Sequence, residues 1–253
     1  MKNFYLALSA TLACTTGALL SMEQPLETKK LPKPFLVVID PGHWSEIKGS
    51  KLINRGCEHY GLKEVVINFT IAKLLEEKLK EQNIHALLTK STVEEFVTNK
   101  ERANIANKNN AALFLRLHCD SNQSPDVNGF TLYYPDQQGQ HERYKGPSLT
   151  VIKQSEQAAL AIHEGMAEAL KGILKDNGIL GDSETFVGKS GQKALTGSIY
   201  SNVPVVLAEM IYLSNKKNAE FITSRDGSNK MVEALLAGIL KHHQSLDTRK
   251  NEF

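Results

Sequence analysis

The segment from Val37 to His43 constrains the fold more than any other part of the chain. It reads Val-Val-Ile-Asp-Pro-Gly-His, so an apolar run stops abruptly at Asp-Pro-Gly and a histidine follows. A short apolar run that ends in turn residues is typical of a buried strand, and the turn presents His43 at the carboxyl edge of that strand. In α/β folds this edge is where ligands bind. The segment therefore predicts a buried sheet with a functional histidine beside it.

Further apolar runs alternate with segments of helical periodicity along the chain. Thr98 and Glu101 form a capping-box pattern at the start of one of these segments. This alternation predicts an α/β fold with three αβα layers around a mostly parallel, mixed sheet. Strands are predicted at 35–39, 85–89, 112–118, 129–134 and 203–209, and helices at 63–80, 98–109, 155–174 and 229–242, with a polar loop at 44–60.

The N-terminus has the pattern of an export signal. Lys2 supplies a positive charge, and the residues from Phe4 to Leu20 carry none. This apolar run is short for a membrane-spanning helix, so we predict a signal peptide over residues 1–22 and a periplasmic or exported protein. The sequence Thr-Leu-Ala-Cys before and including Cys14 is an imperfect lipoprotein site. A lipid anchor at Cys14, with a signal that ends before it, is therefore an alternative.

Composition and length favour one enzyme-sized domain. Residues 23–34 are rich in proline and charge and are predicted to be a linker, 35–243 the catalytic domain, and 244–253 a polar tail. A formal charge of +2 gives no basis for nucleic-acid binding, which needs clustered positive charge. Cys57 and Cys119 are expected to be free, partly buried thiols, because two cysteines do not form a disulfide framework.

Four residues that can bind a metal or transfer a proton stand at the ends of predicted elements. They are His43, Glu64, His118 and Glu209. Taken singly, each histidine is more simply a hydrogen-bonded structural residue, and Glu64 an acid that favours the N-terminus of a helix. Glu209 follows Val-Val-Leu-Ala, and a buried acid is costly unless it is paired or metal-bound. Together the four indicate a catalytic metal site.

The order and spacing of these motifs resemble the zinc-dependent N-acetylmuramoyl-L-alanine amidases, which cut peptidoglycan. The resemblance extends over residues 35–243. The motifs similar to those of the family are Ile39-Asp40-Pro41-Gly42-His43, Gly61-Leu62-Lys63-Glu64, Leu117-His118-Cys119-Asp120, and the strand from Pro204 to Glu209 followed by Tyr212-Leu213-Ser214-Asn215.

The resemblance implies both the chemistry and the role of each residue. One Zn²⁺ would be held by His43, Glu64 and His118, and would activate a water for attack on the amide between N-acetylmuramic acid and L-alanine. Glu209 would take the proton of that water and return it to the leaving amine. Peptidoglycan would be the substrate, in cell division or wall recycling. Glu46 is a rival metal ligand, because His43-x-x-Glu46 is the spacing of the zinc carboxypeptidases.

Two departures from the family pattern bear on substrate binding and regulation. Arg116 stands two residues before the second histidine, where the family has a small residue. By strand alternation it shares a face with His118 and Asp120, so it would bind a substrate carboxylate, pair with Asp120 or form another structural ion pair. The stretch from Gly178 to Gly197 is rich in glycine and has no strong amphipathic pattern. We therefore expect no inhibitory helix over the site.

Two further hypotheses belong to other classes of function. Ser45 and Lys48 form a Ser-x-x-Lys tetrad, and Lys189-Ser190-Gly191 and Ser121-Asn122 resemble the other short motifs of penicillin-binding proteins. The chain would then add a penicillin-sensitive serine DD-carboxypeptidase activity to the amidase. Alternatively, the fold is a peptidoglycan-binding module without catalysis. The presence of Glu209 argues against that second hypothesis.

Overall fold

Strand β1 (Leu36–Pro41) lies inside a six-stranded sheet in the computed structural model. The strand order is β4-β1-β5-β10-β6-β9, and all neighbouring pairs are parallel except β10 and β6. The prediction of a mostly parallel, mixed sheet is confirmed. The remaining strands of this sheet are β4 (His85–Leu88), β5 (Leu113–Asp120), β6 (Phe130–Tyr134), β9 (Asp176–Gly181) and β10 (Val205–Tyr212).

The structure describes Met1, residues 34–44 and residues 54–250. The predicted leader with Cys14 and the linker up to Lys33 lie outside the described residues. So do Ser45 and Lys48, the rival ligand Glu46, and the last three residues. In the described part of the chain, no helix is long and apolar enough to cross a lipid bilayer.

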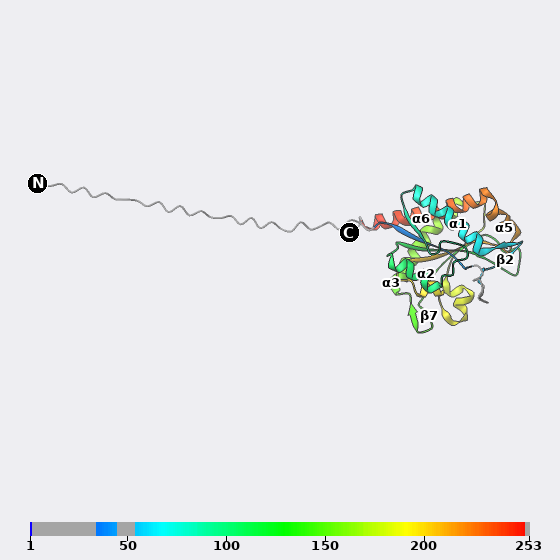
Figure 1. Cartoon of the computed structure of the whole chain (residues 1–253), viewed down its shortest axis with the longest axis horizontal. Coiled ribbons are helices and arrows are strands. Elements are labelled where there is room, and N and C mark those ends of the chain that lie inside the picture. The colour runs from blue at the N-terminus through cyan, green and yellow to red at the C-terminus, as the bar shows by residue number, and fades with distance from the viewer. Residues whose placement is uncertain (2–33, 45–53, 251–253) are drawn as a thin grey trace. The chain divides into compact units, whose positions relative to one another are not determined.

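Helices cover both faces of the sheet and complete the three layers. One face packs against α1 (Glu64–Glu81), α3 (Leu149–Ala169), α5 (Lys216–Thr223) and α6 (Arg225–Lys250), and the larger apolar core lies between them. The other face packs against α2 (Asn99–Lys108) and residues that follow α4 (Thr196–Ile199). Figure 1 shows α1, α5 and α6 along one side of the sheet and β7 (Gly139–His141) on the other.

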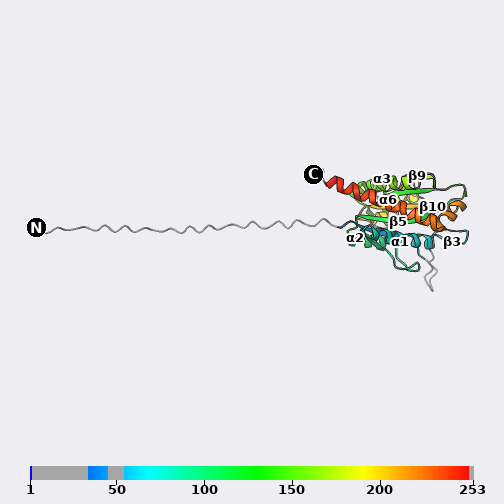
Figure 2. The same cartoon turned by 90° about the horizontal axis from the view of Figure 1, so that it is seen from above.

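Helices α3 and α6 cross at two glycines. A Cβ atom at Gly165 would lie 2.5 Å from the backbone nitrogen of Gly238, and one at Gly238 would lie 2.6 Å from the carbonyl oxygen of Ile162. Any larger residue at this crossing would push the two backbones apart. The two helices consequently lie side by side over the sheet (Figure 2).

Helix boundaries differ from the prediction where polar residues hide the periodicity. Helix α3 was expected at 155–174 but begins at Leu149, because the hydroxyl of Ser148 accepts a hydrogen bond from the amide of Val151 at 3.2 Å. It ends at Ala169, shortly before Gly172, whose φ of 75° is left-handed. Helix α6 continues to Lys250, so most of the polar stretch predicted as a tail belongs to this helix.

Some elements carry too weak a pattern to be predicted from the sequence. Strand β9 reads Asp-Asn-Gly-Ile-Leu-Gly and owes its extended form to pairing with β6 at the sheet edge. The prediction also lacks the hairpin of β7 with β8 (Tyr144–Gly146), the two-residue strands β2 (Glu58–His59) and β3 (Leu62–Lys63), the short helix α4 with the helical turns before it, and α5.

Candidate metal centre

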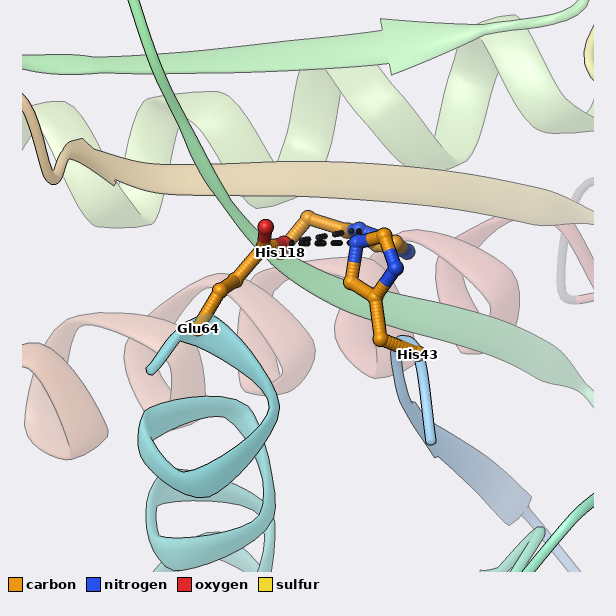
Figure 3. A group of neighbouring side chains, drawn as sticks. All are labelled: His43, Glu64 and His118. Atoms are coloured by element: carbon orange, nitrogen blue, oxygen red, sulfur yellow. Dashed lines mark hydrogen bonds and ion pairs between the residues drawn. The ribbon is translucent and has the colours of Figure 1, made fainter. Parts of the chain in front are cut away.

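Three of the predicted site residues meet at the carboxyl edge of the sheet. His43 follows β1, Glu64 is the first residue of α1, and His118 lies near the end of β5, so three separate elements each supply one side chain (Figure 3). Oε1 of Glu64 lies 3.0 Å from Nε2 of His43 and 3.1 Å from Nδ1 of His118. The two ring nitrogens are 3.1 Å apart. One small ion would therefore reach all three donor atoms.

The Asp-Pro-Gly-His turn is built to bring His43 over β5. The amide of Gly42 donates to the carbonyl oxygen of Leu117 at 2.9 Å, which fixes the turn against the end of that strand. A Cβ atom at Gly42 would lie only 2.3 Å from the ring of His118, so no other residue fits there. His43 itself has a φ of 67°, which is uncommon for a residue other than glycine and is found preferentially at functional sites.

A buried cluster of charged side chains, Asp40, Arg102, Lys90 and Arg116, bonds this turn and fixes it. Arg102 bonds the Asp40 carboxylate at 2.5 Å and the carbonyl oxygen of His43 at 2.7 Å, and Lys90 donates to the same carbonyl at 2.9 Å. Burial alone would raise the pKa of Asp40, but the guanidinium groups of Arg102 and Arg116 hold it well below its usual value. The charges of this cluster thus fix the strained backbone of His43 in one position.

Arg116 belongs to this cluster and not to an ion pair with Asp120. Its Nε bonds Asp40 at 3.0 Å and its Nη2 bonds the side chain of Asn99 at 2.8 Å. Of the predicted alternatives, the structure therefore contains a structural ion pair, with a different acid from the one proposed. Strand alternation places a side chain on a face but does not choose its partner. Binding of a substrate carboxylate by Arg116 stays a prediction.

Hydrogen bonds fix the carboxylate of Glu64. Its Oε2 accepts from the amide of Cys57 at 2.9 Å, and its Oε1 accepts from the amide of Cys119 at 3.0 Å and from the side chain of Asn68 at 3.2 Å. Burial would raise the pKa of Glu64, but the bonds to His118 and His43 keep it well below the usual value. Glu64 is therefore charged at neutral pH and cannot turn away from the two rings.

The two imidazoles are prepared to bind a cation. Burial lowers the pKa of His118 to about 4, so the ring is neutral at neutral pH and retains a free lone pair. Nδ1 of His43 lies 2.7 Å from the side-chain oxygen of Asn54, which leaves Nε2 to face Glu64 and His118. Two imidazoles and one carboxylate are donors that catalytic zinc sites use, so the residues present fit such an ion.

Glu209 shares the cavity with these three residues. It pairs in register with His118 of β5 and Thr131 of β6, and the β10 ladder shifts register between Glu209 and Tyr212. Bulges of this kind are common beside active sites, where they direct a side chain. Its Oε2 is buried, with no hydrogen-bond partner among the described residues. Burial and then the charge of Glu64 raise its pKa well above the usual value.

The cavity has a volume of about 500 Å³, and His43, Glu64, His118 and Glu209 all line it. Part of its lining comes from a segment between β9 and β10 that includes η1 (Asp182–Glu184), η2 (Gly188–Gln192) and α4. These are short turns of helix. That no inhibitory helix acts on this site stays a prediction.

Both cysteines of the domain are free thiols beside the cluster, as predicted. The thiol of Cys57 donates to the carbonyl oxygen of Cys119 at 3.3 Å, and that of Cys119 lies 3.6 Å from the side-chain oxygen of Asn68. Burial, and then the charge of Glu64, raise the pKa of both thiols. They are therefore protonated at neutral pH. Within residues 34–44 and 54–250, the group that could hold a metal ion consists of His43, Glu64 and His118.

Little in the sequence indicates the residues that support the site. Asn54 and Arg102 stand in a polar loop and a polar helix, without any pattern that marks them. Asn68 carries a weak signal, because it follows Glu64 by four residues and so lies on the same face of α1.

Asp182 holds the segment between β9 and β10 together, because its carboxylate accepts from the amide of Leu195 at 3.0 Å, and its burial should make stability depend on pH. Burial raises the pKa of Asp182 to about 6 from 3.8, so the folded state binds an extra proton between these values. Its contribution to stability is therefore present at pH 4 and is lost as the pH rises through 6. We compare the unfolding free energy of Asp182→Asn with that of wild type by urea denaturation at pH 4 and at pH 7.5. The difference, variant minus wild type, should be roughly 2–3 kcal/mol larger at pH 7.5 than at pH 4.

The surface change Asp226→Asn on α6 is the control and should show no such trend with pH. A constant difference between Asp182→Asn and wild type across this range would contradict the assignment of the buried proton to Asp182.

The fold and the site define the class of the protein before any comparison. The αβα fold brings two histidines and a glutamate together at the carboxyl edge of its sheet, and a further acid lines the same cavity. This is the arrangement of a hydrolase with a metal-binding cluster. The chain matches the N-acetylmuramoyl-L-alanine amidase family over residues 37–241, and it belongs to that family. The match includes all four site residues, so the resemblance in sequence is confirmed at the level of the family.

Individual relatives are distant in sequence. The uncharacterized protein YqiI of Bacillus subtilis is 26% identical over 90% of this chain and 91% of its own length. The N-acetylmuramoyl-L-alanine amidase LytC of Bacillus subtilis is 26% identical over 82% of this chain, which spans only 35% of that protein. Among solved structures, the amidase AmiC2 of Nostoc punctiforme superposes with a TM-score of 0.65 at 26% identity, over 83% of this chain and 97% of that one.

Proposed function

We propose that the chain hydrolyses the amide between N-acetylmuramic acid and L-alanine in peptidoglycan, and that it does so with a bound zinc ion. One observation carries the proposal above all. In a chain of the N-acetylmuramoyl-L-alanine amidase family, the donor atoms of His43, Glu64 and His118 all lie within 4.8 Å of one another, and the buried acid Glu209 lines the same cavity. Binding and proton transfer are thus both provided for.

The residues of the chain divide the work between them. His43, Glu64 and His118 would hold the ion, which when bound supplies Lewis acidity and lowers the pKa of water. Glu209 would accept the proton of the attacking water and pass it to the departing amine of L-alanine. A carboxyl group that must take up and give back a proton near neutral pH works best when its pKa is raised towards that pH, and the pKa of Glu209 is raised.

We also propose that the protein works outside the cytoplasmic membrane, where intact peptidoglycan lies. The export pattern of residues 1–22 supports this location, and a lipid anchor at Cys14 remains an alternative form of it. The short helical turns beside the cavity support an enzyme that acts without a partner protein.

Digestion of purified cell-wall sacculi tests the activity. We expect the zinc-loaded protein alone to release stem peptides whose new N-terminus is L-alanine, as identified by mass spectrometry. A chelator should stop the release, and added Zn²⁺ should restore it, because the three ligands lose their ion and regain it. Binding to sacculi without release of peptide would contradict the proposal and favour a non-catalytic binding module.

A further inference from the structure

An exposed aromatic side chain stands at the edge of the cavity. Phe186 lies between η1 and η2 and is 89% exposed, more than any other large apolar residue in the described ranges 34–44 and 54–248. It nevertheless lines the same cavity as the metal cluster. An aromatic ring in the lining of a cavity that also holds a few convergent polar groups is typical of a ligand-binding site.

The backbone around Phe186 is held in place, so its exposure does not come from a loose loop. The carboxylate of Asp182 accepts from the amide of Leu195 at 3.0 Å, which closes the segment at its base. The hydroxyl of Thr185 donates to the carbonyl oxygen of Asp182 at 2.6 Å and accepts from the amide of Gly188 at 3.0 Å. Bonds on both sides of Phe186 thus fix the direction of the backbone. Ordering this segment when a ligand binds would therefore cost little conformational entropy.

The residues next to Phe186 extend the apolar surface into the cavity. Val187 and Leu195 line it from the same segment, and both are half-buried. Leu207 lines it from β10, the strand that carries Glu209. The apolar part of the lining therefore comes both from β10, which carries Glu209, and from the segment that carries Phe186, and Phe186 is the most exposed of these residues.

We infer that Phe186 is a specificity-determining residue that stacks against the sugar ring of N-acetylmuramic acid. This inference rests on the proposed function, because it names the part of that substrate which contacts Phe186 at the edge of the cavity. The scissile amide must lie beside the metal cluster, so a ring at the edge of the cavity meets a group one unit further along the substrate.

The sugar is the neighbour of the amide that fits such a ring. One face of a pyranose carries C–H groups over an area similar to that of a phenyl ring. On the other side of the amide, L-alanine offers a single methyl group followed by polar peptide backbone. Contact with the half-buried Val187 and Leu195 would be enough to bind one methyl group. A methyl group therefore does not explain why an aromatic ring is exposed at the edge of the cavity.

Phe186→Ala, Phe186→Tyr and a matched control test the inference on the zinc-loaded protein. We expect Phe186→Ala to lower kcat/KM on an N-acetylmuramoyl-L-alanyl peptide by about 3- to 10-fold, through KM and not kcat, because stacking holds substrate and transition state alike. Inhibition by N-acetylmuramic acid should weaken by the same factor, while inhibition by the L-alanyl peptide product stays unchanged. Phe186→Tyr should keep wild-type values, as should Leu160→Ala, which removes another exposed apolar side chain, on α3.

The outcomes separate this inference from the proposed function. If the wild type releases no peptide from any substrate, the proposed function fails and the inference falls with it. If the wild type is active, three results overturn the inference alone: an unchanged kcat/KM in Phe186→Ala, weaker inhibition by the peptide product, or a wild type that N-acetylmuramic acid does not inhibit. Equal melting temperatures of variant and wild type show that the fold is intact.

Discussion

Replacing Glu64 with alanine should remove the metal and with it the activity. Among the described residues, Glu64 supplies the one carboxylate of the cluster, and its Oε1 lies within 3.1 Å of a nitrogen of each histidine. Loss of a residue that merely supports a metal ligand costs about 10- to 100-fold in affinity, so loss of a ligand should exceed roughly 100-fold. Isothermal titration of the metal-free protein with Zn²⁺ measures this affinity, and release of stem peptides should fall below detection.

The gain in stability on metal binding gives a second readout for the same variant. At a zinc concentration about 100 times the dissociation constant, wild type should gain about 2.7 kcal/mol in unfolding free energy, and Glu64→Ala should gain almost nothing at that concentration. Glu77→Ala, an exposed acid on the same helix, is the matched control and should bind zinc as wild type does. Full zinc binding by Glu64→Ala, with loss of binding in Glu46→Ala, would transfer the role of ligand to Glu46.

Replacing Glu209 with glutamine should stop turnover and leave zinc in place. The amide has nearly the shape of the carboxylate but accepts no proton, so only the transfer of a proton is lost. General acid–base catalysis contributes about 10²- to 10⁴-fold, and kcat should fall by that factor with little change in KM. Because Glu209 is buried and its pKa is raised, the neutral amide should also keep or increase stability. Metal analysis and initial rates on the same preparation measure both effects.

Glu220→Gln, on the exposed surface of α5, makes the same chemical change away from the cavity and should leave kcat unaltered. A Glu209→Gln protein with wild-type turnover would remove Glu209 from the mechanism. A variant that loses zinc would instead make Glu209 a residue of the metal centre. Together with Glu64→Ala, this pair separates binding of the ion from transfer of the proton.

Much of the architecture could be predicted because it follows from local patterns. The runs that end at Ile39, His118 and Glu209 are apolar almost throughout, which is what a strand buried on both faces requires. Elements were missed where pairing with a neighbouring strand, and not the pattern of side chains, determines the secondary structure. Strand β9 contains two glycines and has its extended form because β6 offers it a free edge.

The candidate site divides in the same way. Its potential ligands could be predicted because they stand directly after a strand, at the start of a helix or near the end of a strand, and parallel strands bring such positions to one edge. Arg116 could be placed on the correct face, but its partner is Asp40, which lies on the neighbouring strand β1. The sequence contains no information about register between strands that are far apart along the chain, so this pair could not be predicted.

The sequence alone determined the class of sheet, the family resemblance and the four residues that the cavity brings together, because each depends on periodicity or on residues adjacent in the chain. Only the tertiary structure decided how those residues are held. Arg102 and Lys90 bond the carbonyl oxygen of His43, and the amides of Cys57 and Cys119 bond the carboxylate of Glu64. The bond between Asp182 and Leu195 closes the segment that carries Phe186. Each of these bonds joins residues that are separated along the chain or needs a specific backbone geometry. Such contacts depend on the packing of whole elements, and no local pattern records them.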